Sequence, residues 1–241
     1  MKLIAADAVT EVETLDGRRV RVRLRVNPRA RRISLRINVA EREAIAVAPT
    51  PRHAQAALAF AAERAHWIAQ QLARVPEGIS FAPGVTIPIR GAAHELVSAP
   101  GRGLAHLLVD PARLVAPTPA GASFAARVTR FLAAEAKRDL TARVDAHCAT
   151  LGVRYSRLTV KDTTSRWGSC TSDGALAFSW RVILAPPMVL DYLAAHEVAH
   201  LVEMNHSRRF WAQVRKALPD YACGRAWLAE HGAGLHRFGA P

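Results

Sequence analysis

Two histidines four residues apart, His196 and His200, with Glu197 directly after the first, place the strongest constraint on how this chain can fold. A helix is predicted to begin at Pro187, where a missing N–H costs nothing. Apolar side chains then recur at helical spacing, at Val189, Leu190, Leu193, Ala194, Leu201 and Val202. Residues four apart share one helix face, so both imidazoles reach the same point. On a half-buried helix these three polar groups need partners, and a metal ion satisfies all of them.

The third ligand is open between two residues. His206 follows His200 at the spacing of the H-E-x-x-H-x-x-G-x-x-H class, but Glu203 stands where that class has glycine. Asn205 is then expected to end the helix, because asparagine tolerates the left-handed conformation. His206 is the favoured ligand. Glu203 is the alternative, since it lies three residues from His200 on roughly the same face.

Three histidines and a water, with Glu197 nearby, form the open type of site for one Zn²⁺ ion. Zinc lowers the pKa of its water towards about 7, and Glu197 is expected to act as the general base and later to pass the proton to the leaving amine. The pattern therefore predicts zinc-dependent hydrolysis of peptide bonds. Two alternatives stay open: a nucleic-acid-binding accessory protein with a structural zinc, and a zinc hydrolase of a small nucleotide-like substrate. A structural zinc has four protein ligands and no need for Glu197.

The residues around the histidines resemble one family. They read SRWGSC at 165–170, GALAFSWR at 174–181, APP at 185–187, LDY at 190–192 and MNHSRRFW at 204–211. This run is similar to the YgjP-like metallopeptidases, distant relatives of the SprT-like zinc proteases. The likeness is strongest over residues 158–232 and extends weakly to 31–36 and 87–91.

By this resemblance His196, His200 and His206 would bind zinc, and Glu197 would be the catalytic base. The resemblance also implies an α+β fold with a zincin-like core of the minimal gluzincin or SprT-like kind. In such a core a small sheet packs on the helix that carries H-E-x-x-H. An N-terminal α/β region would precede it.

Two strands are predicted before this helix, at 158–160 and 176–180, with a turn-rich segment at 167–174 between them. A strand beside the helix would bind a peptide by adding it to the sheet. Arg166 and Trp167 are candidates to line that cleft, and packing in the core is the alternative for Trp167. Tyr192 precedes His196 by four residues and is a candidate to stabilise an oxyanion, with packing again the alternative.

A basic pattern lies near the N-terminus. Residues 19–26 alternate arginine with an apolar residue, which predicts a strand with four arginines on one face: Arg19, Arg21, Arg23 and Arg25. Asn27 and Pro28 predict a turn, and apolar alternation resumes at 33–39, so a basic β-hairpin is expected. With a net charge of +13, these arginines are candidates for binding nucleic acid, and proteins associated with nucleic acid are then candidate substrates. A solvated strand face is the alternative.

Further helices are predicted at 52–75, at 123–151, from a Ser207 cap to residue 218, and from Pro219 onwards. Short strands are predicted within 79–97. The Pro- and Gly-rich segment 98–122 predicts a domain boundary. We therefore expect an N-terminal α/β region at 1–120 and a zincin-like metallopeptidase domain at 121–241.

The three cysteines, Cys148, Cys170 and Cys223, are too widely spaced for a disulfide framework, which fits a reducing compartment. Cys170 is expected to be structural. The first residues contain too short an apolar run for a signal peptide, and no stretch approaches membrane-spanning length. A cytoplasmic protein that acts on protein or peptide and does not engage a membrane is expected.

Overall fold

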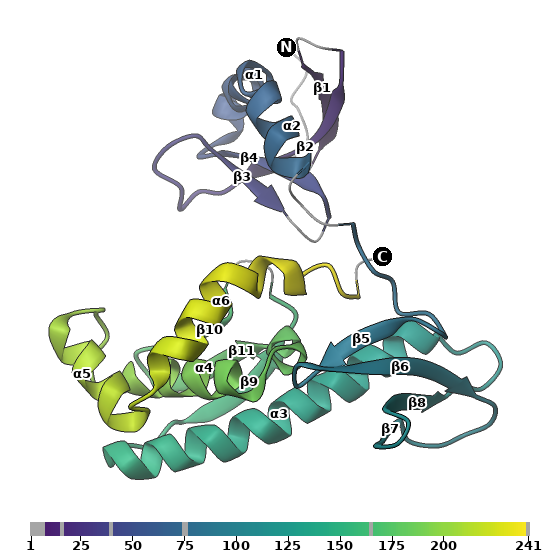
Figure 1. The fold of residues 1–241 in the computed structure, drawn as a ribbon. Helices are drawn as coiled ribbons and strands as arrows, with labels where there is room; N and C mark the ends of the chain where they lie inside the picture. The colour runs from purple at the N-terminus through teal and green to yellow at the C-terminus, as the bar shows by residue number, and fades with distance from the viewer. Residues whose placement is uncertain (1–7, 15–16, 39–40, 74–76, 164–165, 240–241) are drawn as a thin grey trace. The chain divides into compact units, whose positions relative to one another are not determined.

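The computed structural model describes residues 8–14, 17–38, 41–73, 77–163 and 166–239. The chain forms two compact units, Met1–Glu77 and Gly78–Pro241 (Figure 1). The division lies well before the expected boundary at residue 120. Its physical reason is a shared core: Ile87, Leu96 and Leu114 are buried together with Leu132 of the long helix. Residues 78–120 are therefore part of the C-terminal unit.

The N-terminal unit is a four-stranded sheet with two helices packed on it. Its elements are β1 (Val9–Glu13), β2 (Arg19–Val26), β3 (Ser34–Asn38), β4 (Glu43–Ala48), a 3-10 turn (Pro51–His53), α1 (Ala54–Glu63) and α2 (Ala65–Ala73). The spatial order is β1-β2-β4-β3. β2 and β4 are parallel, and the outer pairs are antiparallel. The single helix expected at 52–75 is divided at Arg64, and its expected end lies outside the described residues.

The alternation predicted for β2 is confirmed, because Val20, Val22 and Leu24 are buried while the arginines between them are exposed or half-buried. The predicted hairpin is wrong, since β4 lies between β2 and β3. β4 is buried at every position and so occupies the centre of the sheet. Its sequence, EAIAVA, lacks the polar–apolar alternation that marks a half-exposed strand.

In the residues that the structure describes, the C-terminal unit combines two small sheets with four α-helices and one 3-10 helix, a mixed α+β arrangement. Its strands are β5 (Thr86–Ile89), β6 (Ala92–Ala99), β7 (His106–Leu108), β8 (Arg113–Pro117), β9 (Arg157–Lys161), β10 (Gly168–Cys170) and β11 (Ala175–Ser179). Its helices are α3 (Phe124–Leu151), the 3-10 helix η2 (Trp180–Leu184), α4 (Pro187–Ala199), α5 (Arg208–Ala217) and α6 (Tyr221–Leu235). The sheets have the orders β5-β6-β8-β7 and β10-β11-β9. The segment expected to be only a turn contains β10, which pairs antiparallel with β11.

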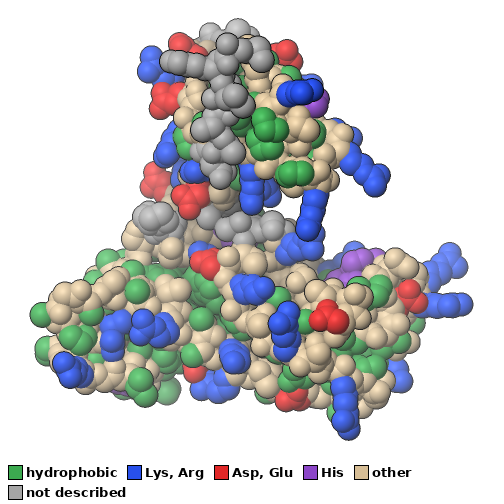
Figure 2. Space-filling view, turned by 180° about the vertical axis from the view of Figure 1, so that it is seen from behind, with side chains coloured by type: hydrophobic (Ala, Val, Ile, Leu, Met, Phe, Trp, Pro, Cys, Tyr) green, Lys and Arg blue, Asp and Glu red, His purple; other side chains and the backbone are tan. Residues whose placement is uncertain are grey.

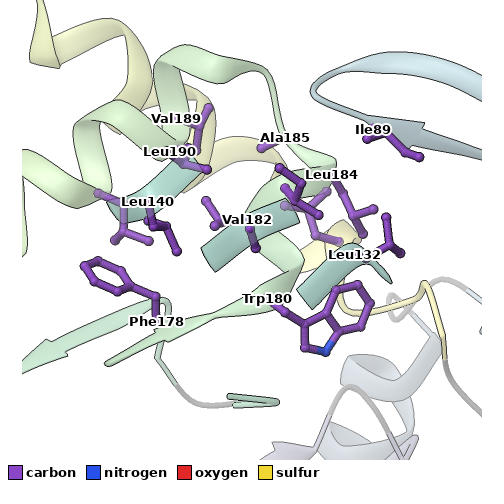
Figure 3. Close-up of a cluster of buried hydrophobic side chains, with 14 of the residues drawn as sticks. Ile89, Leu132, Leu140, Phe178, Trp180, Val182, Leu184, Ala185, Val189 and Leu190 are labelled. Carbon is purple, nitrogen blue, oxygen red and sulfur yellow. The ribbon is translucent and has the colours of Figure 1, made fainter. Parts of the chain in front are cut away.

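One core joins both sheets to the helices. Side chains of α3, β11, η2 and α4 converge in it, among them Leu140, Phe178, Val182 and Val189 (Figure 3). Two predicted helix starts are confirmed by their caps. Ser123 accepts a hydrogen bond from the N–H of Ala126, and Ser207 accepts one from the N–H of Phe210. These caps fix where α3 and α5 begin.

A second, much smaller apolar cluster lies between α4 and α5. Its fully buried members are Ala199, Phe210 and Val214, with Trp211 and Tyr221 packed beside them. Through this cluster α5 packs on α4, and it also contacts α3. Among the helices in the described part of the chain, none is long and apolar enough to cross a membrane.

Candidate metal centre

The H-E-x-x-H motif lies at the C-terminal end of α4 instead of well inside a helix. α4 ends at Ala199, and His200 is its C-cap residue. The N–H groups of Leu201 and Glu203 then donate to carbonyls of the last turn, at 3.0 Å each. These bonds turn the chain without the left-handed residue expected at Asn205, whose φ is not positive. The turn returns the chain towards α4 at His206.

Three imidazoles meet at this turn. One ring nitrogen from each of His196, His200 and His206 lies within 4.8 Å of the others. The Nε2 atoms of His196 and His206 are 3.0 Å apart. His200 can donate from Nδ1 to the backbone carbonyl of Glu203 at 3.2 Å, which leaves its Nε2 as the free donor. Histidine side chains gather at one place on the surface of this unit (Figure 2). The structure thus brings His206 into the group, and Glu203 contributes its carbonyl to the support of His200.

The protein favours the neutral form of two of these histidines, His196 and His200, and the neutral form is the one that binds metals. Burial lowers the pKa of His196 to about 4, and the neighbouring His200 and His206 contribute to that shift. Burial also lowers the pKa of His200. Protons therefore compete weakly for these two nitrogens at neutral pH.

Phe210 supports all three histidines from one side. Its ring is fully buried, and its centroid lies 4.9, 4.4 and 4.6 Å from those of His196, His200 and His206. The pattern of histidines in the sequence does not predict this role of Phe210. The available signal was its place four residues after His206, on the first turn of a helix capped by Ser207.

Tyr192 is buried on the side of α4 that carries His196. Its hydroxyl lies 3.4 Å from Nδ1 of His196, the ring nitrogen that faces away from the histidine group. Its ring also stacks on Tyr221 at 6.4 Å. The structure therefore places Tyr192 behind a candidate ligand, where it can orient the imidazole.

Glu197 is buried beneath the edge strand β10. The residue is only 4% exposed. Gly168 of β10 lies directly against it: a Cβ at this glycine would lie 2.7 Å from Cγ and 2.8 Å from Cδ of Glu197. Burial raises the pKa of Glu197 to about 8, and the positive charge of Arg166 partly opposes that rise. The carboxyl group therefore gains protons easily, as a proton-transfer group must.

A cavity of about 320 Å³ opens above these groups. It is lined by Arg166, Gly168, Ser169, Cys170, His196, Glu197, His200, Met204 and His206. A second cavity of about 430 Å³ shares His200 and Met204 with it. The first cavity lies along β10, an edge strand of its sheet, and the second lies beside the turn at residues 171–174 that follows it.

The two residues expected to line the cleft, Arg166 and Trp167, lie in different environments. Arg166 lines the cavity, as expected. Trp167 packs against the core and stacks on His236 at 4.7 Å, which is the packing alternative. Cys170, expected to be structural, lines the cavity, where burial and the charge of Glu197 raise its pKa to about 11. It is therefore a neutral thiol and does not join the histidine group.

The four arginines of β2 lie in the other unit, on a face that also carries acids. Arg23 donates to Glu43 at 2.5 Å, and Arg19 lies 3.8 Å from Glu11. Arg21 stands opposite Glu11 in the β1–β2 register. The face is therefore partly neutralised, in contrast to the fully basic face that the strand pattern alone suggests.

The comparisons with known proteins bear on this site. The YgjP-like family model, described as a metallopeptidase domain, matches residues 31–231. The chain belongs to the YgjP-like family. The match covers parts of both units, including the histidine group and Glu197. Among curated proteins no match is found.

One solved structure is similar in part to this YgjP-like protein. It is the crystal structure of the metallopeptidase zymogen of Pyrococcus abyssi abylysin. The similarity covers 38% of this chain and 93% of that chain, with 17% sequence identity and a TM-score of 0.35.

The close approach of Gly168 to Glu197 gives a first prediction for this YgjP-like protein. Replacing Gly168 with Ala should force the carboxyl group or β10 to move, and turnover should fall by about 100-fold because a displacement near 1 Å has this effect. Peptide-cleavage assays of the metal-loaded protein measure it. Gly234→Ala in α6 is the matched control, since a Cβ there meets nothing within 4 Å. Equal activity of the two variants would contradict the prediction.

A second prediction concerns the metal-free protein and pH. Because the pKa of Glu197 rises from 4.5 to about 8 on folding, its contribution to stability is full below pH 4.5 and is lost as pH rises towards 8. Glutamine does not titrate. The stability of Glu197→Gln relative to wild type should therefore increase by a few kcal/mol between pH 5 and pH 8. Urea unfolding with chelator at both pH values measures the difference, in which histidine effects cancel. If the difference in unfolding free energy between the two proteins were the same at both pH values, burial would not raise the pKa of Glu197.

Proposed function

We propose that this chain is a zinc-dependent peptidase, with zinc held by His196, His200 and His206 and with Glu197 as the general base. The observation that carries the proposal is the convergence of three imidazoles on one point beside a buried carboxyl group, in a cleft open to solvent. A structural zinc would use four protein ligands and would be closed. The membership of a metallopeptidase family supports the same conclusion.

The donor set fits zinc. Zinc–nitrogen bonds of about 2.0–2.1 Å in tetrahedral geometry place two donors roughly 3.3 Å apart, and the Nε2 atoms of His196 and His206 are 3.0 Å apart. The carbonyl of Glu203 and the hydroxyl of Tyr192 face the remaining nitrogens of His200 and His196. Such partners orient metal-binding histidines and fix their tautomers. Helix α4, which carries H-E-x-x-H, and the small sheet β10-β11-β9 beside it would then correspond to a zincin-like core.

The side chains divide the chemistry between them. When bound, zinc supplies Lewis acidity, which polarises the scissile carbonyl and makes water acidic enough to ionise near neutral pH. Glu197 accepts the proton of the attacking water and passes it to the leaving amine. Gly168 leaves room for this carboxyl group beneath the strand. Arg166, at the rim, favours the ionised form of Glu197.

The substrate is an extended polypeptide bound along β10. This strand has a partner on one side only, so its outer edge can pair with a further strand. One cavity follows that edge, and a second, beside the turn at residues 171–174, adjoins it at His200 and Met204. Met204 is 49% exposed and offers an apolar contact to a substrate side chain. A segment in extended conformation would place its scissile bond above the histidine group.

The test is cleavage of a fluorescently labelled unfolded protein by the full chain loaded with one equivalent of zinc. We expect cleavage that stops with a chelator and returns when zinc is restored. Metal content measured on the same samples separates failure to bind zinc from failure to cleave. A zinc-loaded protein that cleaves neither this substrate nor short peptides would overturn the proposal.

A further inference from the structure

The edge of the N-terminal sheet carries a groove. Side chains on the inner face of β2 and β4 are buried beneath the helices, whereas Leu35 and Ile37 on the inner face of β3 are only half-buried. β3 is an edge strand, and α2 does not close over it fully. The result is a cavity of about 380 Å³ lined by Arg32, Ile33, Leu35, Phe60, Arg64 and Trp67. All of these residues belong to one unit.

The lining combines aromatic rings with guanidinium groups. Trp67 is 40% exposed, which is a large apolar surface to leave in water. The guanidinium carbon of Arg64 lies 5.7 Å from the ring centroid of Phe60. Arg32 also lines the groove and is exposed. A ligand matched to these groups has flat rings and negative charge.

The charge of this region is not balanced locally. Between residues 17 and 40 the chain has nine arginines in all and no Asp or Glu. In the part of the chain that the structure describes, no ion pair joins Arg32 or Arg64 to an acidic side chain. The outer face of the same sheet differs, because Glu11 and Glu43 pair with Arg19 and Arg23 there. Two of the arginines without an acidic partner among the described residues, Arg32 and Arg64, therefore lie together at the groove.

We propose that this groove binds single-stranded nucleic acid. Bases stack on Trp67, and the phosphates on either side pair with Arg32 and Arg64. Every base has a π-face, so stacking of this kind is tolerant of sequence. Guanidinium groups bind phosphate through two parallel hydrogen bonds, and the exposed ring of Trp67 beside them favours a ligand that carries flat bases as well as negative charge. The bases of a duplex are already stacked in its interior and cannot reach a groove of this size. The proposal is independent of the peptidase activity.

The test measures binding of a fluorescently labelled 12-nucleotide single-stranded DNA to the full chain by anisotropy, at 50 and 200 mM salt. We expect binding that weakens with salt. Trp67→Ala should raise Kd by about tenfold, the effect of losing one stacked base, and Trp67→Phe should restore most of the affinity. Changing both Arg32 and Arg64 to Gln should weaken binding and reduce the salt slope by about 1.4, or about 0.7 for each phosphate that no longer pairs with a guanidinium group.

The matched control removes the same charge from the outer face of the sheet, by changing both Arg21 and Arg25 to Gln. We expect this variant to bind the oligonucleotide with nearly unchanged affinity. Equal weakening by both double variants, or no effect of Trp67→Ala, would overturn the proposal in favour of non-specific attraction. Tighter binding of an acidic peptide than of the oligonucleotide would overturn it in favour of a protein partner. Zinc content and circular dichroism confirm that each variant is folded.

Discussion

Replacing Glu197 with Gln is expected to reduce peptide cleavage by between about 100-fold and 10,000-fold, the range that general acid–base catalysis contributes. The carboxyl group lies beneath Gly168 in the cavity that holds the histidine group, so the variant removes proton transfer and keeps the shape of the site. Zinc should still bind with one equivalent, because glutamine changes none of the three imidazoles. Cleavage rates and metal content measured on the same preparation test both expectations.

The control for this variant is Ser169→Ala. Ser169 lines the same cavity from strand β10 and has no assigned role in the proton transfer. Its removal should change the rate only slightly. Undiminished cleavage by Glu197→Gln, with zinc bound, would show that another group accepts the proton. Loss of zinc in Glu197→Gln would instead assign the carboxyl group to metal binding.

Replacing His206 with Ala is expected to weaken zinc binding by more than about 100-fold. Loss of a partner behind a metal ligand already costs up to about that factor, and loss of a ligand costs more. His206 is exposed and follows α4 in a turn, so its removal should leave the cores intact. Competition with a chromophoric chelator measures the affinity, and thermal unfolding of the metal-free protein shows whether the fold is retained.

Glu203→Ala distinguishes the two candidates for the third ligand. Since Glu203 supports His200 through its backbone carbonyl, which alanine also has, this variant should keep its zinc. The opposite pattern, with zinc retained in His206→Ala and lost in Glu203→Ala, would assign the third ligand to the carboxylate. Retention in both variants would imply a ligand from outside this turn.

Local patterns in the sequence predict the single elements of this fold well. The helix of the histidines, the capped starts of α3 and α5 and the alternation of β2 all follow from side chains near in sequence. Pairing between distant segments is different in kind. β4 pairs in parallel with β2, and the sequence of a short apolar strand of this type does not indicate which strands it pairs with. A hairpin is the nearest local solution, which is why the sequence suggested it.

The candidate site shows the same division. The spacing of His196, Glu197 and His200 along one helix is enough to predict that they share a site. The role of Gly168 cannot be predicted in this way, because it depends on how closely β10 passes over α4. Phe210 likewise contacts the three histidines only after the chain has turned at residues 200–206. Close approaches between elements are properties of the packed structure, and a single sequence does not reveal them.

The small cluster beneath α5 has a consequence for how the packing of this helix depends on metal. α5 packs on α4 mainly through Phe210 and Val214, apart from the large core. His206 lies at the start of that segment, and its partners lie at the end of α4. A metal ion held by the three histidines would join the end of α4 to the segment before α5 and so close the loop between the two helices. If zinc binds as proposed, the stability of the α4–α5 packing and the metal content of the protein should therefore change together.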